Sequence, residues 1–485
     1  MGIQQSYQKF IVGMLLFLGI TVHHVSAQQR KNVVIIYSDD QSYHTIRAWG
    51  NPEIQTPNLD LLVAEGLSFK QAHVMGGHQG AVCIPSRVMM LTGRYLNRLP
   101  QDGSTIPDSI IGLPEILRTR GYTTFHSGKW HSDKNSHDRF FSAGDHIFFG
   151  GMHFEGDGGQ FNPFVYHYDG GGRYPKDNGW KSETYSSQLY ADAAIKFLGS
   201  ATAKEKPFLC YVAFTSPHDP RTPPSGFRGK HHPTDMTLPP NFLPQHPFDN
   251  GDLRVRDEML LPHPRTPEAI QQQIALYYDM VSEMDAQVGR ILAVLDSSGL
   301  RENTLIIFAG DNGLAVGQHG LLGKQNLYEH SIRVPMVFSG PGIPKNQSSN
   351  AFVYLSDITP TIYDWLEIPV PSSVEASSLL PIIKDSRATV RDRMYNIYGH
   401  WSRSLKTRDG YKLIAYNVNG VQTVQLFNLR KDPWEMTNLY RDPTQQRRIK
   451  RMWQQLQEEM QTKHDDLDLE LPNWGRKVGQ KGSGS

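Results

Sequence analysis

Acidic side chains follow two separate apolar segments of this 485-residue sequence. Asp39 and Asp40 come directly after NVVIIYS, and Asp311 and Asn312 come directly after TLIIFAG. If both segments are strands of an open parallel sheet, these four side chains lie at the edge where ligands bind. Their carboxylate and amide oxygens would suit a hard cation such as Ca²⁺ or Mg²⁺. One such pair alone is more typical of a turn or a helix cap, whereas two pairs at strand ends favour a metal site.

The block CIPSRVMMLTGR, which begins at Cys83, combines a nucleophile with a proline and an arginine. Proline fits the first position of a helix, where its missing N–H costs little, so we expect a helix to begin beside Cys83 with Pro85 in that position. The positive end of the helix would face whatever binds there, and Arg87 would reach the same place from one turn further on. This arrangement suits an anion, although an ordinary helix start accounts for the same residues equally well.

The sequence contains two cysteines, Cys83 and Cys210. Cys210 lies in the apolar run PFLCYVAF, where we expect a buried thiol. Cys83 lies in a polar, glycine-rich stretch. A disulfide between the two cysteines is the ordinary alternative, and a special chemical fate for Cys83 is the more specific hypothesis.

Short apolar runs separated by helical patterns predict the elements that position these side chains. The predicted strands are residues 32–37, 122–126, 207–214, 304–308 and 334–338, and the predicted helices are residues 59–64, 113–120, 186–198 and 267–296. Apolar strands that alternate with helices predict an α/β fold, with a large, mostly parallel sheet sandwiched between helices. Residues 220–266 are rich in proline and show little periodicity, as long functional loops often do.

The pattern changes after about residue 371. Residues 403–429 alternate, and they contain the hairpin turn signals Asp409-Gly410 and Asn419-Gly420. We therefore predict an α/β domain over residues 28–370 and a smaller C-terminal subdomain over residues 371–475. The subdomain would hold an antiparallel sheet followed by a helix over residues 444–462, and residues 476–485 would form a frayed tail.

The composition and the N-terminus predict an exported protein. The sequence has 49 Lys+Arg against 48 Asp+Glu and is 38% hydrophobic, which fits a globular protein and argues against a disordered chain or a basic nucleic-acid binder. Residues 1–27 combine Lys9, the apolar run FIVGMLLFLGI and small residues up to Ala27, as a secretory signal peptide does. We expect a periplasmic or secreted protein with no membrane anchor and no nucleic-acid partner.

The block at Cys83 resembles the signature of the formylglycine-dependent type I sulfatases, Cys-x-Pro-Ser-Arg followed by x-x-Leu-Thr-Gly-Arg. Six further blocks resemble the same family in the family's order: NVVIIYSDDQ, GYTTFHSGKWH, TSPHDPRTPP, FAGDNG, GLLGKQNLYEHSIRVPMVFSGPG and GYKLIAYNV with LFNLRKDPWEMTNL. The resemblance covers nearly all of the chain after the signal peptide. It implies the alkaline phosphatase-like fold and the hydrolysis of sulfate monoesters.

The resemblance also implies two cofactors. A formylglycine-generating enzyme would oxidise Cys83 to formylglycine, and the hydrate of this aldehyde would be the nucleophile. One Ca²⁺, or less readily Mg²⁺, would be held by Asp39, Asp40, Asp311 and Asn312, with the side chain at position 83 completing the ligand shell.

The resemblance assigns the catalytic roles to six residues: Cys83, Arg87, Lys129, His131, His218 and Lys324. Arg87 would hold the formylglycine and the carboxylates. Lys129 and His131 would face one anion, since alternate residues of an extended segment point the same way. His218, assisted by Lys324, would protonate the leaving alkoxide, and His131 would remove a proton from the second hydroxyl of the hydrate as sulfate leaves.

The substrate implied by the resemblance is a sulfated carbohydrate, such as an oligosaccharide of an algal galactan, of ulvan or of a glycosaminoglycan. Loop residues near the motifs are candidates for binding the sugar: Gln41, Tyr43, His44, Asp219, Arg221, His400, Trp401 and Arg403. For each of them an ordinary structural role is the simpler interpretation. Two other functions stay open, a phosphodiesterase or phosphonate monoester hydrolase of the same superfamily, and a non-catalytic relative that binds calcium or carbohydrate.

Overall fold

The computed structural model describes residues 31–154, 156, 158–469 and 474–475. The signal peptide predicted over residues 1–27 and the tail predicted over residues 476–485 lie outside the described residues. Within the described part, no helix is long and apolar enough to cross a membrane. Each predicted strand and helix is present, with ends within three residues of those expected.

The predicted large sheet is confirmed. In spatial order, its strands among the described residues are β11 (Gln347–Tyr354), β2 (Gly66–His73), β10 (Met336–Ser339), β9 (Thr304–Gly310), β1 (Asn32–Ser38), β8 (Phe208–Ala213), β4 (Thr123–Lys129), β5 (Ala143–Phe148), β6 (Phe164–Tyr166) and β7 (Gly179–Lys181). The central strands from β9 to β5 run parallel to one another, whereas β10 is antiparallel to both β9 and β2.

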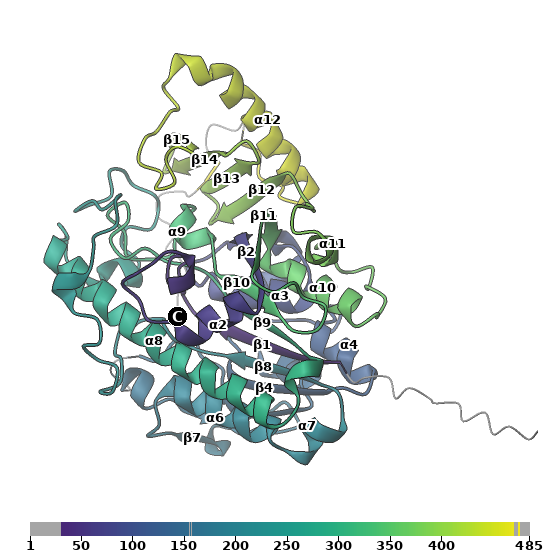
Figure 1. The fold of residues 1–485 in the computed structure, drawn as a ribbon. Coiled ribbons are helices and arrows are strands. Elements are labelled where there is room, and N and C mark those ends of the chain that lie inside the picture. The colour runs from purple at the N-terminus through teal and green to yellow at the C-terminus, as the bar shows by residue number, and fades with distance from the viewer. Residues whose placement is uncertain (1–30, 155, 157, 470–473, 476–485) are drawn as a thin grey trace, which may run out of the picture. The chain divides into compact units, whose positions relative to one another are not determined.

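Helices cover both faces of this sheet (Figure 1). Alternate residues of β1 explain why, since Val34 and Ile36 join one apolar core and Val33 and Ile35 join another. The core of Val34 is completed by α2 (Pro57–Ala64), α6 (Ser186–Leu198), α7 (Ala201–Glu205) and α8 (Pro267–Ser297). The core of Val33 is completed by α3 (Cys83–Thr92), α4 (Leu113–Thr119), α5 (Lys134–Phe140), α10 (Ile358–Trp365) and α11 (Leu380–Lys384).

The register of the central strands brings their carboxyl ends to one edge. Ser38 pairs with Gly310 across β1 and β9, Tyr37 pairs with Ala213 across β1 and β8, and Gly128 pairs with Ala213 across β4 and β8. The segments that follow these strands therefore start side by side. This is the edge at which ligands bind in open α/β sheets.

The predicted antiparallel C-terminal sheet and helix are also present. The sheet is made of β15 (Val421–Asn428), β14 (Tyr411–Val418), β13 (Ser402–Thr407), β12 (Arg393–Tyr398) and β3 (Gly76–Gly77), and α12 (Gln446–Thr462) packs with it. Its first four strands are antiparallel, whereas β3 runs parallel to β12 and comes from the segment just before Cys83. The sequence pattern gave no sign of this last pairing.

The structure differs from two expectations about the residues around the cysteines. The helix α3 begins at Cys83 itself, so Pro85 is its third residue and the prediction of a first-position proline was wrong. The N–H groups of the first turn have no partner within the helix, so proline is tolerated there as well. Cys83 and Cys210 are both buried and free, which contradicts the disulfide alternative.

A buried charge cluster joins the C-terminal sheet to the part of the chain between β9 and β10. Glu329, at the start of α9 (Glu329–Ile332), accepts hydrogen bonds from Lys406 at 2.6 Å and Lys412 at 3.0 Å, and Lys412 also contacts Glu435 at 2.8 Å. All four side chains are buried. Although burial alone raises the pKa of Glu329, the two lysines outweigh it and hold the pKa well below its usual range.

We predict that Glu329→Gln destabilises the protein strongly, because it leaves two buried ammonium groups short of a counter-charge. Removing one partner of a buried ion pair costs about 3–5 kcal/mol. Urea unfolding followed by circular dichroism measures the change. Glu367→Gln is the matched control, since Glu367 forms an exposed pair with Lys31 at 2.7 Å. Equal unfolding midpoints for the two variants would contradict this role of the cluster.

Candidate active site

The two acid pairs predicted at strand ends meet at the edge of the sheet. Asp40 donates its backbone N–H to Asp311 Oδ1 at 3.0 Å, and Asn312 donates its amide to Asp40 Oδ1 at 2.6 Å. Asp40 has a left-handed backbone conformation (φ of 62°), which ends the strand alternation, so its carboxylate lies on the same side as that of Asp39. All four side chains are buried.

This cluster fits a hard cation. Within the described residues, the buried atoms Asp39 Oδ1 and Asn312 Oδ1 have no hydrogen-bond partner, which is costly unless a ligand satisfies them. Asp39, Cys83 and Asp311 each offer a ligand atom within 4.8 Å of the others. Carboxylate and amide oxygens are the donors that Ca²⁺ and Mg²⁺ prefer.

Cys83 lies at the start of α3, between a lysine and a histidine. Its Sγ is 3.4 Å from Lys129 Nζ and 3.3 Å from His131 Nδ1. The prediction that both residues face one point agrees with these distances, but the predicted extended geometry was wrong. Lys129 ends β4, and His131 has a left-handed backbone conformation (φ of 63°), so a turn brings its ring back to Cys83.

The surroundings of Cys83 disfavour its thiolate form. Burial raises its pKa, and Lys129 and Lys324 offset burial only in part. Since the thiolate is the reactive form, this shift favours the less reactive thiol.

Arg87 holds the carboxylates from within α3. Its Nε and Nη2 donate to Asp311 Oδ2 at 3.1 and 2.9 Å, and Nη1 donates to the backbone oxygen of Lys129 at 3.2 Å. Nη2 also lies 3.7 Å from Asp39 Oδ1. The guanidinium therefore links α3 to the ends of three strands.

Lys324 and His218 form a second pair across the site. Lys324 Nζ is 2.6 Å from Asp40 Oδ1 and 3.3 Å from His218 Nε2. The other ring nitrogen of His218, Nδ1, lies 3.1 Å from Asp219 Oδ1. The site thus has a cation and a histidine on each side, Lys129 with His131 and Lys324 with His218.

The pKa values of the two histidines are shifted in opposite directions. Burial lowers the pKa of His218, but Asp40 and Asp219 outweigh it and leave the pKa above its ordinary value. Burial, together with Lys129 and Arg87, brings the pKa of His131 well below its ordinary value. His218 is therefore suited to donate a proton and His131 to accept one.

The predicted sugar-binding residues lie in varied settings. Among those after the strand ends, Gln41 and Tyr43 are buried, and Gln41 donates to Thr45 Oγ1 at 3.0 Å. His44 is exposed and stacks on Trp434 with ring centroids 5.0 Å apart. Asp219 contacts His218, and Arg221 is buried. Within the described part of the chain, Nε and Nη2 of Arg221 have no hydrogen-bond partner.

The three remaining candidates lie in the turn between β12 and β13 or within β13, and their surroundings differ. His400 is exposed and stacks on His78, with centroids 5.7 Å apart. Trp401 is buried and donates to the backbone oxygen of Asn250 at 2.7 Å. Arg403 is buried and pairs with Asp465 at 2.6 Å, so its charge is already balanced inside the fold.

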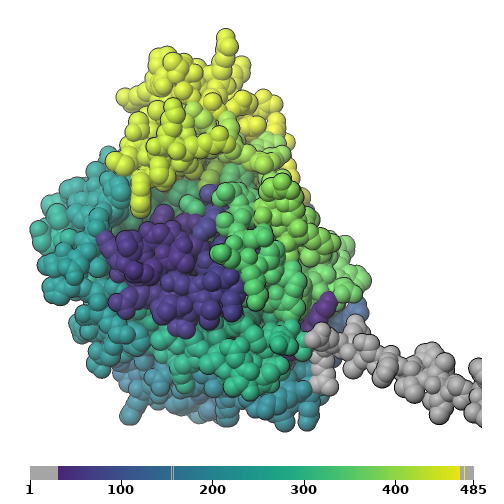
Figure 2. Space-filling model, in the orientation of Figure 1, coloured from purple at the N-terminus to yellow at the C-terminus, as the bar shows by residue number. Residues whose placement is uncertain are grey.

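Sequence reasoning missed residues of the proline-rich segment 220–266. Asn250 contacts Trp401, and the hydroxyl of Tyr398 donates to Asp252 at 2.5 Å, so the segment adjoins the C-terminal sheet. Figure 2 shows the C-terminal residues in yellow beside teal residues from the middle of the chain. Arg256, in the same segment, pairs with Asp219. The proline-rich composition marks the segment as a whole, but no motif or periodicity marks these individual residues.

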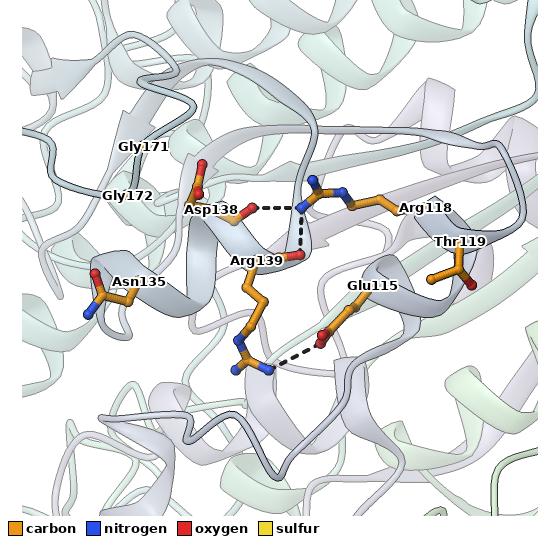
Figure 3. Close-up of a pocket in the computed structure, with 8 residues that line it drawn as sticks. All are labelled: Glu115, Arg118, Thr119, Asn135, Asp138, Arg139, Gly171 and Gly172. Atoms are coloured by element: carbon orange, nitrogen blue, oxygen red, sulfur yellow. Dashed lines mark hydrogen bonds and ion pairs between the residues drawn. The ribbon is translucent and has the colours of Figure 1, made fainter.

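A surface hollow of about 680 Å³ lies apart from these residues (Figure 3). Its lining contains none of the predicted site residues. Arg118 there donates to backbone oxygens of Asp138 and Arg139, and Arg139 pairs with Glu115 at 3.1 Å. The charged groups of Arg118, Arg139 and Glu115 in the hollow are thus already bonded to other groups of the protein.

Comparison with known proteins places the chain in a family. A family model described as Sulfatase matches residues 31–368, and one described as N-sulphoglucosamine sulphohydrolase, C-terminal, matches residues 317–462. The N-acetylglucosamine-6-O-sulfatase of Bacteroides thetaiotaomicron is 26% identical over 91% of this chain and 88% of its own length.

Solved structures show the same fold. A protein in complex with its substrate D-glucosamine-2-N,6-O-disulfate superposes with a TM-score of 0.74 at 24% identity, over 90% of this chain and 99% of that one. The phosphonate monoester hydrolase of Agrobacterium radiobacter superposes with a TM-score of 0.71 at 21% identity, over 90% and 96%. The fold alone therefore does not separate the two activities, but the Sulfatase model covers most of the sequence. The chain belongs to the sulfatase family, whose members are sulfuric ester hydrolases.

Proposed function

We propose that this sulfatase releases sulfate from a sulfated carbohydrate, an oligosaccharide of a sulfated polysaccharide such as an algal galactan, ulvan or a glycosaminoglycan. The observation that carries the proposal is the convergence of Lys129 and His131 on Cys83, at the start of α3 and beside the buried acid cluster. The name of the Bacteroides relative, an N-acetylglucosamine-6-O-sulfatase, supports a sugar ester as the substrate. We also propose that the chain is exported and matured by a formylglycine-generating enzyme.

The proposed cofactors follow from the same residues. Asp39, Asp40, Asp311 and Asn312 would hold one Ca²⁺, with the side chain at position 83 completing the shell. When bound, the cation supplies positive charge that offsets the charge of the sulfate oxygens. Formylglycine made from Cys83 supplies, as its hydrate, an oxygen nucleophile that a buried thiol does not provide.

The remaining side chains of the site then have defined tasks. Lys129 and Lys324 balance the negative charge of the sulfate group, and Arg87 keeps Asp311 in place. His218 donates a proton to the leaving oxygen of the sugar, with Lys324 beside its Nε2. His131 accepts a proton from position 83, which its Nδ1 already contacts.

A phosphodiesterase or phosphonate monoester hydrolase is the second candidate, favoured by the similar fold of the Agrobacterium enzyme. Many phosphoryl-transfer relatives bind two transition metals. Among the described residues, the two groups of potential ligands share Asp39 and contain one histidine between them, so their donors are mainly carboxylate oxygens, which suit a hard cation better than two transition metals. This geometry supports the sulfatase proposal.

We predict that Cys83 is converted to formylglycine in active protein. Mass spectrometry of the tryptic peptide that contains position 83 should show the aldehyde. Cys83→Ala should retain the fold and lose nearly all turnover, whereas Cys210→Ala, which removes the other buried thiol, should keep it. Full activity from protein whose Cys83 is entirely unmodified would contradict the proposal.

Metal content gives the next prediction. Asp311→Ala should lower both bound calcium and activity by about 10-fold or more, because even residues that support a metal ligand contribute 10–100-fold. Elemental analysis measures the metal, and Asn312→Ala serves as a second variant that leaves the Arg87 partner intact. Asp296→Ala, which removes an exposed carboxylate, is the control. Two zinc or two manganese ions per chain would instead favour the phosphodiesterase.

The two histidines should differ in their dependence on the leaving group. A sugar alkoxide needs a proton to leave, whereas a nitrophenolate departs with little help. His218→Ala should therefore reduce turnover of a sugar sulfate by about 10²–10⁴-fold and that of a nitrophenyl sulfate far less. His131→Ala should affect both substrates by similar factors, since its proton comes from position 83. Equal losses for both substrates in His218→Ala would mean that His218 is not the proton donor.

A further inference from the structure

Arg256 lies between the two loops that carry His218 and Lys324. It begins the 3₁₀ turn η8 (Arg256–Leu260) within the proline-rich segment 220–266. Both of its Nη atoms contact the carboxylate of Asp219, with Nη2 3.1 Å from Oδ1, and Nη2 is also 2.6 Å from Asp257 Oδ1. One guanidinium therefore contacts two carboxylates, that of Asp219, which follows His218, and that of Asp257, its own neighbour in the turn.

The first carboxylate, that of Asp219, contacts His218. Asp219 Oδ1 is 3.1 Å from His218 Nδ1, and the backbone oxygen of Asp219 is 2.8 Å from the same nitrogen. With Nδ1 held in this way, the opposite nitrogen Nε2 faces Asp40, at 3.5 Å, and Lys324, at 3.3 Å. The ring is thus held by both the backbone oxygen and the carboxylate of Asp219, and the carboxylate is the contact that a change at Arg256 can move.

The second carboxylate, that of Asp257, contacts Gln325, the residue that follows Lys324. Asp257 Oδ2 accepts a hydrogen bond from the amide of Gln325 at 2.8 Å, and the same amide donates to the backbone oxygen of Gly80 at 3.2 Å. The next residue of the turn, Glu258, accepts the backbone N–H of Gly323 at 2.8 Å. The residues on either side of Lys324 are therefore held by the turn that Arg256 begins.

The burial of these groups explains why a cation is needed. Asp219 is 4% exposed, and a buried carboxylate is costly without a charged partner. Arg256 supplies that charge while its own side chain stays 42% exposed, so water and solutes reach it. Arg221, the other nearby arginine, bonds the amide of Gln273 and forms no ion pair within the described residues.

We propose that Arg256 is a positioning residue for the proton-donating pair of His218 and Lys324. It fixes Asp219 against Nδ1 of His218 and Asp257 against Gln325, and so aims His218 Nε2 and Lys324 Nζ at the leaving oxygen. The proposal rests on the role proposed above for His218. It gives the proline-rich segment a task in the reaction that the sequence did not suggest.

The test compares Arg256→Gln with the wild type on a sugar sulfate and on a nitrophenyl sulfate. We expect kcat on the sugar sulfate to fall on the order of 10–100-fold, at least five times more than on the nitrophenyl ester, with little change in KM. Arg254→Gln, which removes an exposed arginine two residues away, is the matched control and should behave as the wild type. A higher KM with unchanged kcat would overturn the proposal and make Arg256 a substrate-binding residue.

Two further measurements keep the proposal testable if no aryl ester is accepted. Guanidinium ions should restore activity to Arg256→Ala, because the vacated position is open to solvent. In a double-mutant cycle on the sugar sulfate, Arg256→Gln should cause a smaller loss in the Asp219→Asn background than alone, since the part of its effect that passes through His218 is already lost and only the part through Asp257 and Lys324 remains. Fully additive losses without guanidinium rescue would overturn the role of Arg256.

The outcomes also separate this proposal from the function on which it rests. If the wild type releases sulfate and His218→Ala shows the expected leaving-group dependence, equal losses for both esters in Arg256→Gln overturn the positioning role alone. If the wild type releases no sulfate from any ester, the proposed function fails and the role of Arg256 fails with it.

Discussion

The site depends on the balance between buried carboxylates and buried cations at one edge of the large sheet. The register of the parallel strands places Asp39, Asp40 and Asp311 close together out of water, where like charges repel one another and lose hydration. Arg87, Lys129 and Lys324 each contact one or more of these carboxylates. The two lysines are also the cations assigned to the sulfate group. A divalent cation at the acids would free both lysines for an anionic substrate, so metal and substrate would support each other's binding.

Segments outside the central sheet contact the residues at this edge and hold them in place. The short strand β3 ties the chain before Cys83 into the C-terminal sheet, and the Glu329 cluster joins the same sheet to α9. The proline-rich segment reaches the site from the other direction through Arg256. The position of Cys83 and the orientation of His218 are thus set by parts of the chain that are far from them in sequence.

How well each part of the structure could be predicted from the sequence depends on the kind of interaction that forms that part. Buried parallel strands are continuous apolar runs, so β1, β8 and β9 and the acids after them could be predicted from local pattern. The assignment of Lys129, His131, His218 and Lys324 depended on the family resemblance, because single lysines and histidines carry no local signal. The turn at His131, the two-residue strand β3 and the contacts of Arg256 arise from tertiary packing, and no periodicity in the sequence records them.

Release of sulfate from a panel of defined sulfated oligosaccharides, measured beside phosphodiester and phosphonate monoester substrates, tests the central claim most directly. The account predicts that the wild type releases sulfate from at least one sulfated saccharide faster than it cleaves any phosphorus ester, and that Cys83→Ala releases none. Faster cleavage of a phosphodiester or phosphonate ester than of every sulfated saccharide would contradict it.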